Sequence, residues 1–573
     1  MSMTSTALYQ KANELAGRGQ WQDARASYEQ AIAQEPQFAE AHNNLGMAFA
    51  HLGDGAKALH HFHQAYSIKP VLKDAFANFA HLMMQLSENG YTATIIKDNL
   101  AVRDLIGRAT TVWPGRLPAE ALLNDPAFQE TIKNPYLLFY LGAIRLRDAE
   151  IEQMLTQMRF ALLAAADANE IQPELFAFAC ALARQCFNNE YVFALSDDEA
   201  KQASGLRERV QADLDTGKEI PAHRLAILAS YFPLNSLPNA AKLLGMNWPE
   251  MLLYLLVQQV QEPQQEREIR EKLPQLTPIE DETSRKVREQ YEANPYPRWV
   301  ITSTPERQVS FEEYMTLSFP HAGTRKFKEH IDVLFAGCGT GSVVAGFGQL
   351  IANAKILAVD LSLSSLSYAK RMADHYKLKR TEFGQADILK LPSLGRKFDL
   401  ICSTGVMHHM ADPLAAWRGL VSMLSPGGYM HLGFYSELAR KEVSEAWDFI
   451  KQHGYGKTAG EIRRFRQDVM ALPDGTPMKR ALTSPDFYSV SDVRDLLFHE
   501  HELRVTIPQI KQFLAENKLE FIGWELPTET RKRYVKEFPA DPTLTNLDNW
   551  QAFEEKFPRT FSQMYKFWVQ KAA

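Results

Sequence analysis

The chain has 573 residues, 45% of them hydrophobic and 11% aromatic, which is enough for about three or four packed domains. Its 63 Lys and Arg against 69 Asp and Glu give a net charge of −6, which excludes a global basic field for nucleic-acid backbones. The opening residues are polar, and no apolar run approaches the ~20 residues of a bilayer span. The four cysteines lack zinc-site spacing. We therefore expect a cytoplasmic protein with no nucleic-acid or membrane partner.

A repeat of 34 residues occupies the first part of the chain. Four positions of one unit recur in the next, as Ala24 and Ala58, Tyr28 and Phe62, Ala31 and Ala65, and Pro36 and Pro70. This spacing resembles the tetratricopeptide repeat, in which small residues let paired helices pack closely. The resemblance implies a tetratricopeptide-repeat domain of helical pairs over residues 1–90.

One position of the repeat carries an amide in three successive units, namely Gln10, Asn44 and Asn78. Stacked repeats would line these amides along one surface, where they can bond the backbone of an extended peptide. We therefore predict that the repeats dock a protein or peptide substrate. The alternative is a consensus asparagine without a ligand. The histidines on a second helix of the array are expected to face solvent, and they are His60, His61 and His63.

Residues 91–270 carry apolar residues at helical spacing, as in Leu155, Met158 and Leu162, and predict a helical middle domain. From Ile331 short β-rich runs alternate with helical stretches, which predicts a parallel, doubly wound sheet. We place a linker and lid at 271–325 and an α/β domain at 326–573, with a mostly helical insertion at about 437–515. The predicted fold is multidomain, with an all-α N-terminal half and a Rossmann-like α/β C-terminal domain.

A glycine-rich turn joins the first strand of this region to a helix. Its glycines are Gly337, Gly339 and Gly341. They allow a ligand to approach the backbone and the free amides of a helix N-terminus. Asp360 ends the next strand, where a carboxylate can take both hydroxyls of a ribose, and Asp387 follows the third and can accept from an adenine amine. A dehydrogenase would need a further glycine where Val344 stands.

The order of these motifs, followed by FDLICSTGVMHHM and LSPGGYMHLGFY, resembles the class I S-adenosylmethionine-dependent methyltransferases over about residues 325–573. The resemblance implies S-adenosylmethionine as cofactor, with the three glycines under its methionine part, Asp360 on its ribose and Asp387 at its adenine. It also places Ile388 at the adenine and Thr404 and Gly405 along the cofactor. Phe335 departs from the family, which usually has an acid there to orient the cofactor's amino group, so another polar residue should do this.

Two histidines, His408 and His409, follow the fourth strand, where this fold faces its substrate. A neutral imidazole can take a proton from the nucleophile, so one of them is a candidate base. The alternative is that they only pack or form hydrogen bonds. A second cluster, from Phe498 to Glu502, has alternate histidines that a helix would point apart, so we expect a solvated face there and no metal.

An aromatic segment with two prolines, Tyr291–Trp299, precedes the first strand. In this fold such a stretch often covers the cofactor. We predict that Arg298 holds the cofactor's carboxylate and that Tyr296 and Trp299 wall the substrate side of the pocket. The alternative is a linker that packs on the edge of the sheet.

These patterns predict a methyltransferase that acts on an N or O atom of a protein or peptide docked by the repeats. A second hypothesis is methylation of a small molecule or glycan, with the helical half only forming a homo-oligomer. A third is a non-catalytic repeat scaffold with a vestigial cofactor fold. The intact glycine turn and both aspartates count against the third, whereas nothing in the sequence separates the first two.

Overall fold

The structure, a computed structural model, describes residues 3–69, 72–88, 91–302, 305, 307–322, 326–327, 329–499 and 502–572. Contacts group the chain into two compact units. The helical unit comprises Met1–Phe187, Leu195–Pro233 and Asn247–Leu255, and the sheet unit comprises Asn188–Ala194, Leu234–Met246 and Leu256–Ala573. The domain boundaries that we place at residues 90, 270 and 325 stay predictions. Among the described helices, none combines the length and apolarity that a membrane crossing would require.

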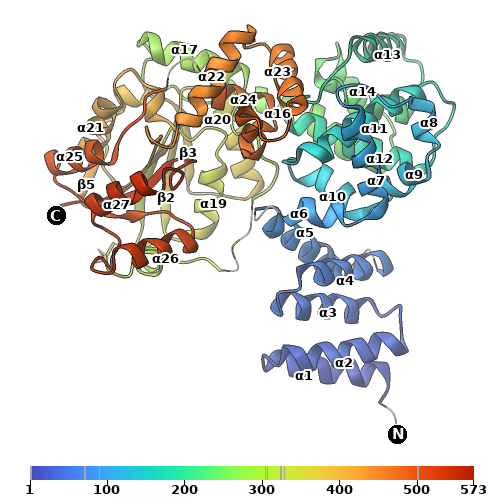
Figure 1. The fold of residues 1–573 in the computed structure, drawn as a ribbon, viewed down its shortest axis with the longest axis horizontal. Helices are drawn as coiled ribbons and strands as arrows, with labels where there is room; N and C mark the ends of the chain where they lie inside the picture. The colour runs from blue at the N-terminus through green and yellow to red at the C-terminus, as the bar shows by residue number, and fades with distance from the viewer. Residues whose placement is uncertain are drawn as a thin grey trace. The chain divides into compact units, whose positions relative to one another are not determined.

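The first five helices are α1 (Ser5–Gly17), α2 (Trp21–Gln34), α3 (Ala39–His51), α4 (Gly55–Ile68) and α5 (Lys73–Glu88), and they stack in succession (Figure 1). Small residues let the paired helices pack closely. A Cβ atom on Gly46, for example, would lie only 2.6 Å from the Phe62 ring. His60 is exposed as expected, but His61 and His63 are partly buried. Nδ1 of His61 lies 3.1 Å from Nδ1 of His42, and the His61 ring stacks on Phe49.

The remainder of the helical unit is also all-α, as predicted. Its helices are α6 (Tyr91–Lys97), α7 (Leu100–Val112), α8 (Ala119–Leu123), α9 (Pro126–Thr131), α10 (Pro135–Ala143), α11 (Ala149–Ala165), α12 (Pro173–Asn188), α13 (Asp197–Thr216), α14 (Ala222–Ala229) and α15 (Glu250–Leu256). Helix α11 is buried along most of its length. Its Arg159 pairs with buried Glu199 at 2.8 Å, and Glu199 also accepts from Tyr231 at 2.8 Å and pairs with Arg116.

A seven-stranded sheet forms the centre of the sheet unit (Figure 1). Its strands are β1 (Ile331–Ala336), β2 (Ala354–Asp360), β3 (Thr381–Gln385), β4 (Phe398–Thr404), β5 (Leu424–Phe434), β6 (Leu519–Trp524) and β7 (Tyr565–Lys571). Their order is β3-β2-β1-β4-β5-β7-β6, with β7 antiparallel to both of its neighbours. The predicted doubly wound sheet is therefore confirmed, with β1 to β5 parallel as expected and the antiparallel β7 making the whole sheet mixed. Its order reverses between β1 and β4, where such folds bind ligands.

Helices cover both faces of the sheet because successive strand residues point to opposite sides. In β1, Leu334 and Ala336 belong to one core and Val333 and Phe335 to the other. The sheet helices are α19 (Ser342–Leu350), α20 (Leu363–His375), α21 (Pro413–Met423), α25 (Ile507–Glu516), α26 (Thr528–Glu537) and α27 (Leu547–Lys556).

The predicted insertion is helical, with α22 (Lys441–His453), α23 (Ala459–Ala471) and α24 (Val490–Leu497) before α25. Before β1 lie α16 (Glu262–Arg270), α17 (Glu282–Ala293) and α18 (Phe311–Ser318). The segment around α16 belongs to the sheet unit, since Glu262 and Glu266 both pair with Arg371 of α20. Gln275 forms a parallel bridge with Gln385 at the end of β3.

Candidate active site

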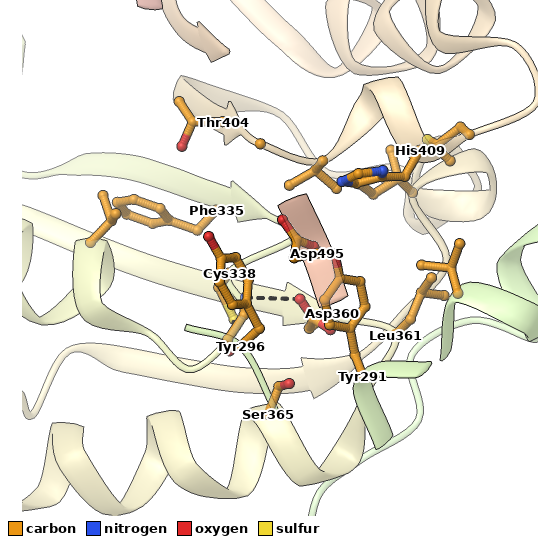
Figure 2. A pocket seen from close by; sticks show the side chains of 18 of the residues that line it. Tyr291, Tyr296, Phe335, Cys338, Asp360, Leu361, Ser365, Thr404, His409 and Asp495 are labelled. Carbon is orange, nitrogen blue, oxygen red and sulfur yellow. Dashed lines mark hydrogen bonds between the residues drawn. The ribbon is translucent and has the colours of Figure 1, made fainter. Parts of the chain in front are cut away.

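A cavity of about 260 Å³ lies at the carboxyl ends of β1, β2 and β4, where the strand order reverses (Figure 2). Its walls come from the turns after these strands, from α17 and the segment that follows it, from α24, and from the start of β7. Segments distant in the sequence thus meet at one end of the sheet, which is the usual place for a ligand in an open α/β fold.

The glycine turn after β1 forms the floor of the cavity. Gly337 has φ of 81° and Gly339 φ of 51°, a backbone region that other residues rarely adopt. Added Cβ atoms would also lie 2.5 Å from Val406 and 2.6 Å from the carbonyl oxygen of Tyr296. Both glycines line the cavity, whereas Gly341, at the N-terminus of α19, is not among its lining residues.

Asp360 connects β2 to the glycine turn. Its two carboxylate oxygens accept backbone hydrogen bonds, one from Gly339 at 2.8 Å and the other from Ser362 at 2.9 Å. Each oxygen keeps a further acceptor position. Burial raises the pKa of Asp360, and the backbone N–H donors oppose that rise. A ligand that donates two hydroxyl hydrogens would satisfy this carboxylate, and a ribose is such a ligand.

Asp387 is fully buried in the cavity wall. Its Oδ1 accepts from Leu389 N–H at 3.0 Å, while its Oδ2 has no hydrogen-bond partner among the described residues. The hydroxyl of Ser365, also in the wall, likewise lacks one there. Buried polar atoms are nearly always paired, so these two indicate a polar ligand. The amine of an adenine fits Asp387, and Ile388 lines the cavity beside it. These residues therefore fit S-adenosylmethionine.

The other predicted residues divide between the cavity wall and its surroundings. Thr404, Gly405 and Tyr296 line the cavity. Trp299 is not among the lining residues, and its Nε1 donates to the Thr340 carbonyl at 3.0 Å. Arg298 is also absent from the lining, and it opposes the rise that burial causes in the pKa of Glu190. The predicted roles of these residues stay predictions.

The two histidines after β4 take different places. His409 lines the cavity and is 2% exposed, whereas His408 lies behind it, with the two Nε2 atoms 3.1 Å apart. The His408 ring packs 4.1 Å from that of Tyr435. Burial, followed by the neighbouring His409, lowers the pKa of His408 well below its ordinary value. His409 is therefore the better placed of the two candidate bases, and its role stays a prediction.

The sequence did not indicate Thr277, whose hydroxyl accepts from Asp387 N–H at 2.8 Å, or Asp495 of α24, which lines the cavity. Tyr291 of α17 donates to Asp495 at 2.5 Å.

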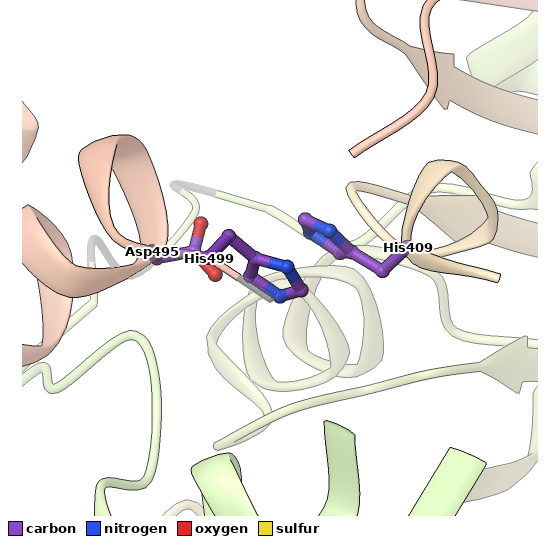
Figure 3. Close-up of side chains that lie close together, drawn as sticks. All are labelled: His409, Asp495 and His499. Carbon is purple, nitrogen blue, oxygen red and sulfur yellow. The ribbon is translucent and has the colours of Figure 1, made fainter. Parts of the chain in front are cut away.

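His499 does not lie on the solvated helix face that the sequence led us to expect. Helix α24 ends at Leu497, so helical spacing does not apply to His499. Its partly buried ring stacks on His409, with ring centroids 3.6 Å apart (Figure 3). The aromatic segment Tyr291–Trp299 contains Tyr291, but no sequence pattern indicated Asp495.

The strand order, the glycine turn and the acids after β2 and β3 define the fold of a class I methyltransferase. A family model described as a methyltransferase domain matches residues 327–465, and one described as a tetratricopeptide repeat matches residues 9–71. A ubiquinone/menaquinone biosynthesis C-methyltransferase from Pseudomonas putida is 30% identical over 180 residues, which cover 30% of this chain and 69% of that protein. The chain belongs to the class I S-adenosylmethionine-dependent methyltransferases and carries tetratricopeptide repeats.

Other similar proteins match over a smaller share of their length. An uncharacterized protein from Synechococcus sp. is 26% identical over 236 residues, covering 39% of this chain and 55% of that protein. The structure of PKMT2 from Rickettsia typhi in complex with AdoHcy is similar with a TM-score of 0.37 and 17% identity, over 47% of this chain and 54% of that one. The chain thus spans about half the length of these two proteins.

Proposed function

We propose that the chain transfers a methyl group from S-adenosylmethionine to a nitrogen or oxygen atom of a protein or peptide docked by its repeats. The observation that carries the transfer is the buried Oδ2 of Asp387, which lacks a partner among the described residues and shares one cavity with Asp360 and the glycine turn. The observation in favour of a protein substrate is the repeat array itself, since such arrays present long surfaces for extended chains.

S-adenosylmethionine supplies an electrophilic methyl group on a sulfonium, which is a good leaving group. Asp360 would accept from the ribose hydroxyls and Asp387 from the adenine amine, so the two acids would orient the cofactor at the ends of β2 and β3. Gly337 and Gly339 leave room for its methionine part. The remaining work of the protein is to orient the nucleophile and to remove its proton, for which His409 lies in the cavity wall.

Hydrogen bonds connect amides of successive repeats in a row. The row contains the predicted Asn44 and Asn78, and it also contains Asn13 and Asn43, which were not predicted. Asn44 donates from Nδ2 to Asn13 at 2.9 Å, and Asn78 donates to Asn43 at 3.1 Å. Gln10 is exposed. Amides held in this way keep fixed orientations, which lowers the entropic cost of binding a peptide backbone. A second docking point would also raise the effective concentration of a protein substrate at the cavity.

Transfer of labelled methyl from the cofactor into host lysate tests this proposal. We expect label in a protein band, and we expect Asn44→Ala with Asn78→Ala to raise the apparent KM for that protein while the cofactor affinity stays constant. Gln30→Ala, at an exposed position of α2, is the matched control. Label confined to small, dialysable material would contradict a protein substrate.

Methylation of a small molecule is the second candidate. Similarity to the Pseudomonas relative favours it, since that protein is a C-methyltransferase of ubiquinone and menaquinone biosynthesis. In that case the double asparagine variant should change folding stability at most, and label should appear in the dialysable fraction of the same experiment.

A further inference from the structure

A buried acid lies in the cavity apart from the two that fit the cofactor. Asp495 of α24 is 5% exposed and lines the cavity together with Tyr291 and Tyr296 (Figure 2). The two tyrosine ring centroids are 6.4 Å apart. Burial and the neighbouring Asp495 raise the pKa of Tyr291 well above its ordinary value, so its hydroxyl keeps the proton that it donates. This part of the wall therefore combines one carboxylate with two neutral aromatic rings.

A metal is one ligand to consider for this carboxylate. His409, Asp495 and His499 each offer a ligand atom, and these atoms lie within 4.8 Å of one another. The geometry disfavours a metal, however, because the two imidazoles stack with an interplanar angle of only 19° (Figure 3). A metal binds in the plane of each ring at ~2 Å, and an ion between two stacked rings would lie far out of both planes.

The stacked histidines His409 and His499 are better suited to accepting a proton than to binding a metal. Two imidazolium rings 3.6 Å apart would repel each other, so at most one of His409 and His499 is in the positively charged imidazolium form. Either ring can then accept a proton that enters the cavity, and His409 is the one in its wall. Tyr291 bridges this pair to the acid, since its hydroxyl lies 3.4 Å from Nε2 of His499 and 2.5 Å from Oδ1 of Asp495.

The cations around Asp495 have other carboxylates beside them. Arg440 pairs with Glu502 at 2.7 Å and lies 3.5 Å from the ring centroid of Tyr435, which removes that ring face from the cavity. Lys566 lines the cavity, and it helps to lower the pKa of its neighbour Glu525. Burial raises the pKa of Asp495, and His499, Tyr291 and Arg440 oppose that rise, so a further cation in the cavity would add to these contacts with the carboxylate.

We propose that the nucleophile is an amine, which enters the cavity as an ammonium ion held by Asp495 and by the rings of Tyr291 and Tyr296. This inference rests on the proposed methyl transfer. Carboxylates and aromatic faces are the groups that bind ammonium ions in proteins. A carboxylate substrate would be repelled by Asp495, and a neutral hydroxyl would gain less from this carboxylate than an ammonium ion, which makes a charge-assisted contact.

With an amine as nucleophile, the atoms, protons and electron pairs of the methyl transfer are all accounted for. The ammonium gives one proton to His409, which leaves a lone pair on the neutral amine. That nitrogen forms the new N–CH₃ bond while the bond between the methyl carbon and sulfur breaks, and the electron pair of the broken bond stays on sulfur. The products are a methylammonium ion, a protonated His409 and a neutral thioether.

The chemical stability of the transferred label tests the substrate class. Full-length protein, lysate and labelled S-adenosylmethionine are incubated, and the labelled products are treated with mild base and then hydrolysed in acid. We expect label that resists base and elutes as an N-methyl amine, whether from a lysine side chain, an amino terminus or a small amine. Base-labile methyl ester, or label on carbon or hydroxyl oxygen, would overturn the inference while methyl transfer stands. No transferred label would overturn both proposals.

Variants test the role of Asp495 in the same assay. We expect Asp495→Asn to reduce transfer to the amine by about tenfold or more and Asp495→Glu to restore part of it, because a charge-assisted contact is lost and then regained. Calorimetry should show the same affinity for S-adenosylmethionine in both variants and in wild type. Asp474→Asn, an exposed acid of the same insertion, is the control. Full transfer by Asp495→Asn, or one equivalent of zinc bound by wild type and not by His499→Ala, would overturn the assignment.

Discussion

The carboxylate of Asp360 accepts a hydrogen bond from the backbone N–H of Gly339 at 2.8 Å. The acid that ends β2 therefore fixes the glycine turn that follows β1, in addition to facing the cavity. A substitution of Asp360 changes both the cofactor site and the conformation of the turn, and the two effects can be measured separately.

We expect Asp360→Asn to weaken S-adenosylmethionine binding by about 100-fold, since hydrogen bonds to charged groups contribute roughly 1.5–3 kcal/mol each. Calorimetry on the full-length protein measures the affinity, and a thermal melt reports any loosening of the turn. Asp374→Asn, an acid of α20 that is 60% exposed and pairs with Lys370, is the control. Equal binding heats for Asp360→Asn and wild type would contradict the cofactor site.

Asp387→Asn should separate binding from stability. The amide keeps an oxygen for the Leu389 N–H but presents a donor where Oδ2 lacked a partner among the described residues, so cofactor affinity should fall by about tenfold. The free energy of unfolding should stay the same or rise, because a buried charge is removed. Calorimetry and denaturant unfolding measure the two quantities. Loss of stability in proportion to loss of affinity would show that Asp387 is only a structural cap.

The repeats should lose stability in weak acid. Burial, with smaller effects from His42 and His60, lowers the pKa of His61 from 6.5 to about 4. The unfolded chain then holds this proton more tightly than the folded one, so the stabilisation is complete above pH ~6.5 and is lost as the pH falls toward 4. Amide exchange in α3 and α4 should therefore accelerate in wild type relative to His61→Gln between pH 6.5 and 4.5. His51→Gln, at an exposed position, should behave like wild type.

Glu199→Gln should destabilise the helical unit strongly. Glu199 is fully buried, and its loss leaves the nearly buried guanidinium of Arg159 without its carboxylate. Breaking a buried ion pair on one side typically costs ~3–5 kcal/mol. Denaturant unfolding of the full chain, followed by a probe in the helical unit, measures this change. Glu208→Gln on the exposed side of α13 should have little effect, and a similarly small change for Glu199→Gln would refute the argument.

The sequence predicted the parts of the site that are local in the chain. The turn from Gly337 to Gly341 and the acid Asp360 each lie at a strand end, and strand periodicity with a glycine spacing is enough to place them. The helical repeats were equally predictable, because their spacing recurs within one short segment. The α/β architecture followed from the alternation of β-rich and helical runs, whereas the strand order and the antiparallel β7 come from the structure.

Residues brought in by long-range packing were not predictable in this way. Thr277 lies 110 residues before Asp387, and Asp495 lies 108 residues after it. Only the folded chain shows that Thr277 accepts from the Asp387 N–H and that Asp495 lines the same cavity as Asp387. His499 was misplaced because a helical spacing was applied beyond the end of α24. Trp299 does not line the cavity, and its indole N–H donates to a carbonyl of the glycine turn, while its predicted role at the substrate stays a prediction.

The short segment Asn188–Ala194 is part of the sheet unit, although the residues on both sides of it belong to the helical unit. Its backbone carbonyls accept from Arg463 and Arg466 of α23, and the Glu190 carboxylate accepts from the N–H of Ser491 at the start of α24, the helix that carries Asp495. The catalytic half therefore cannot be moved between genes as one contiguous cassette. A hybrid that starts at Leu256 would lack these acceptors, so recombination of this protein with other repeat arrays must keep residues 188–194 together with the insertion that they support.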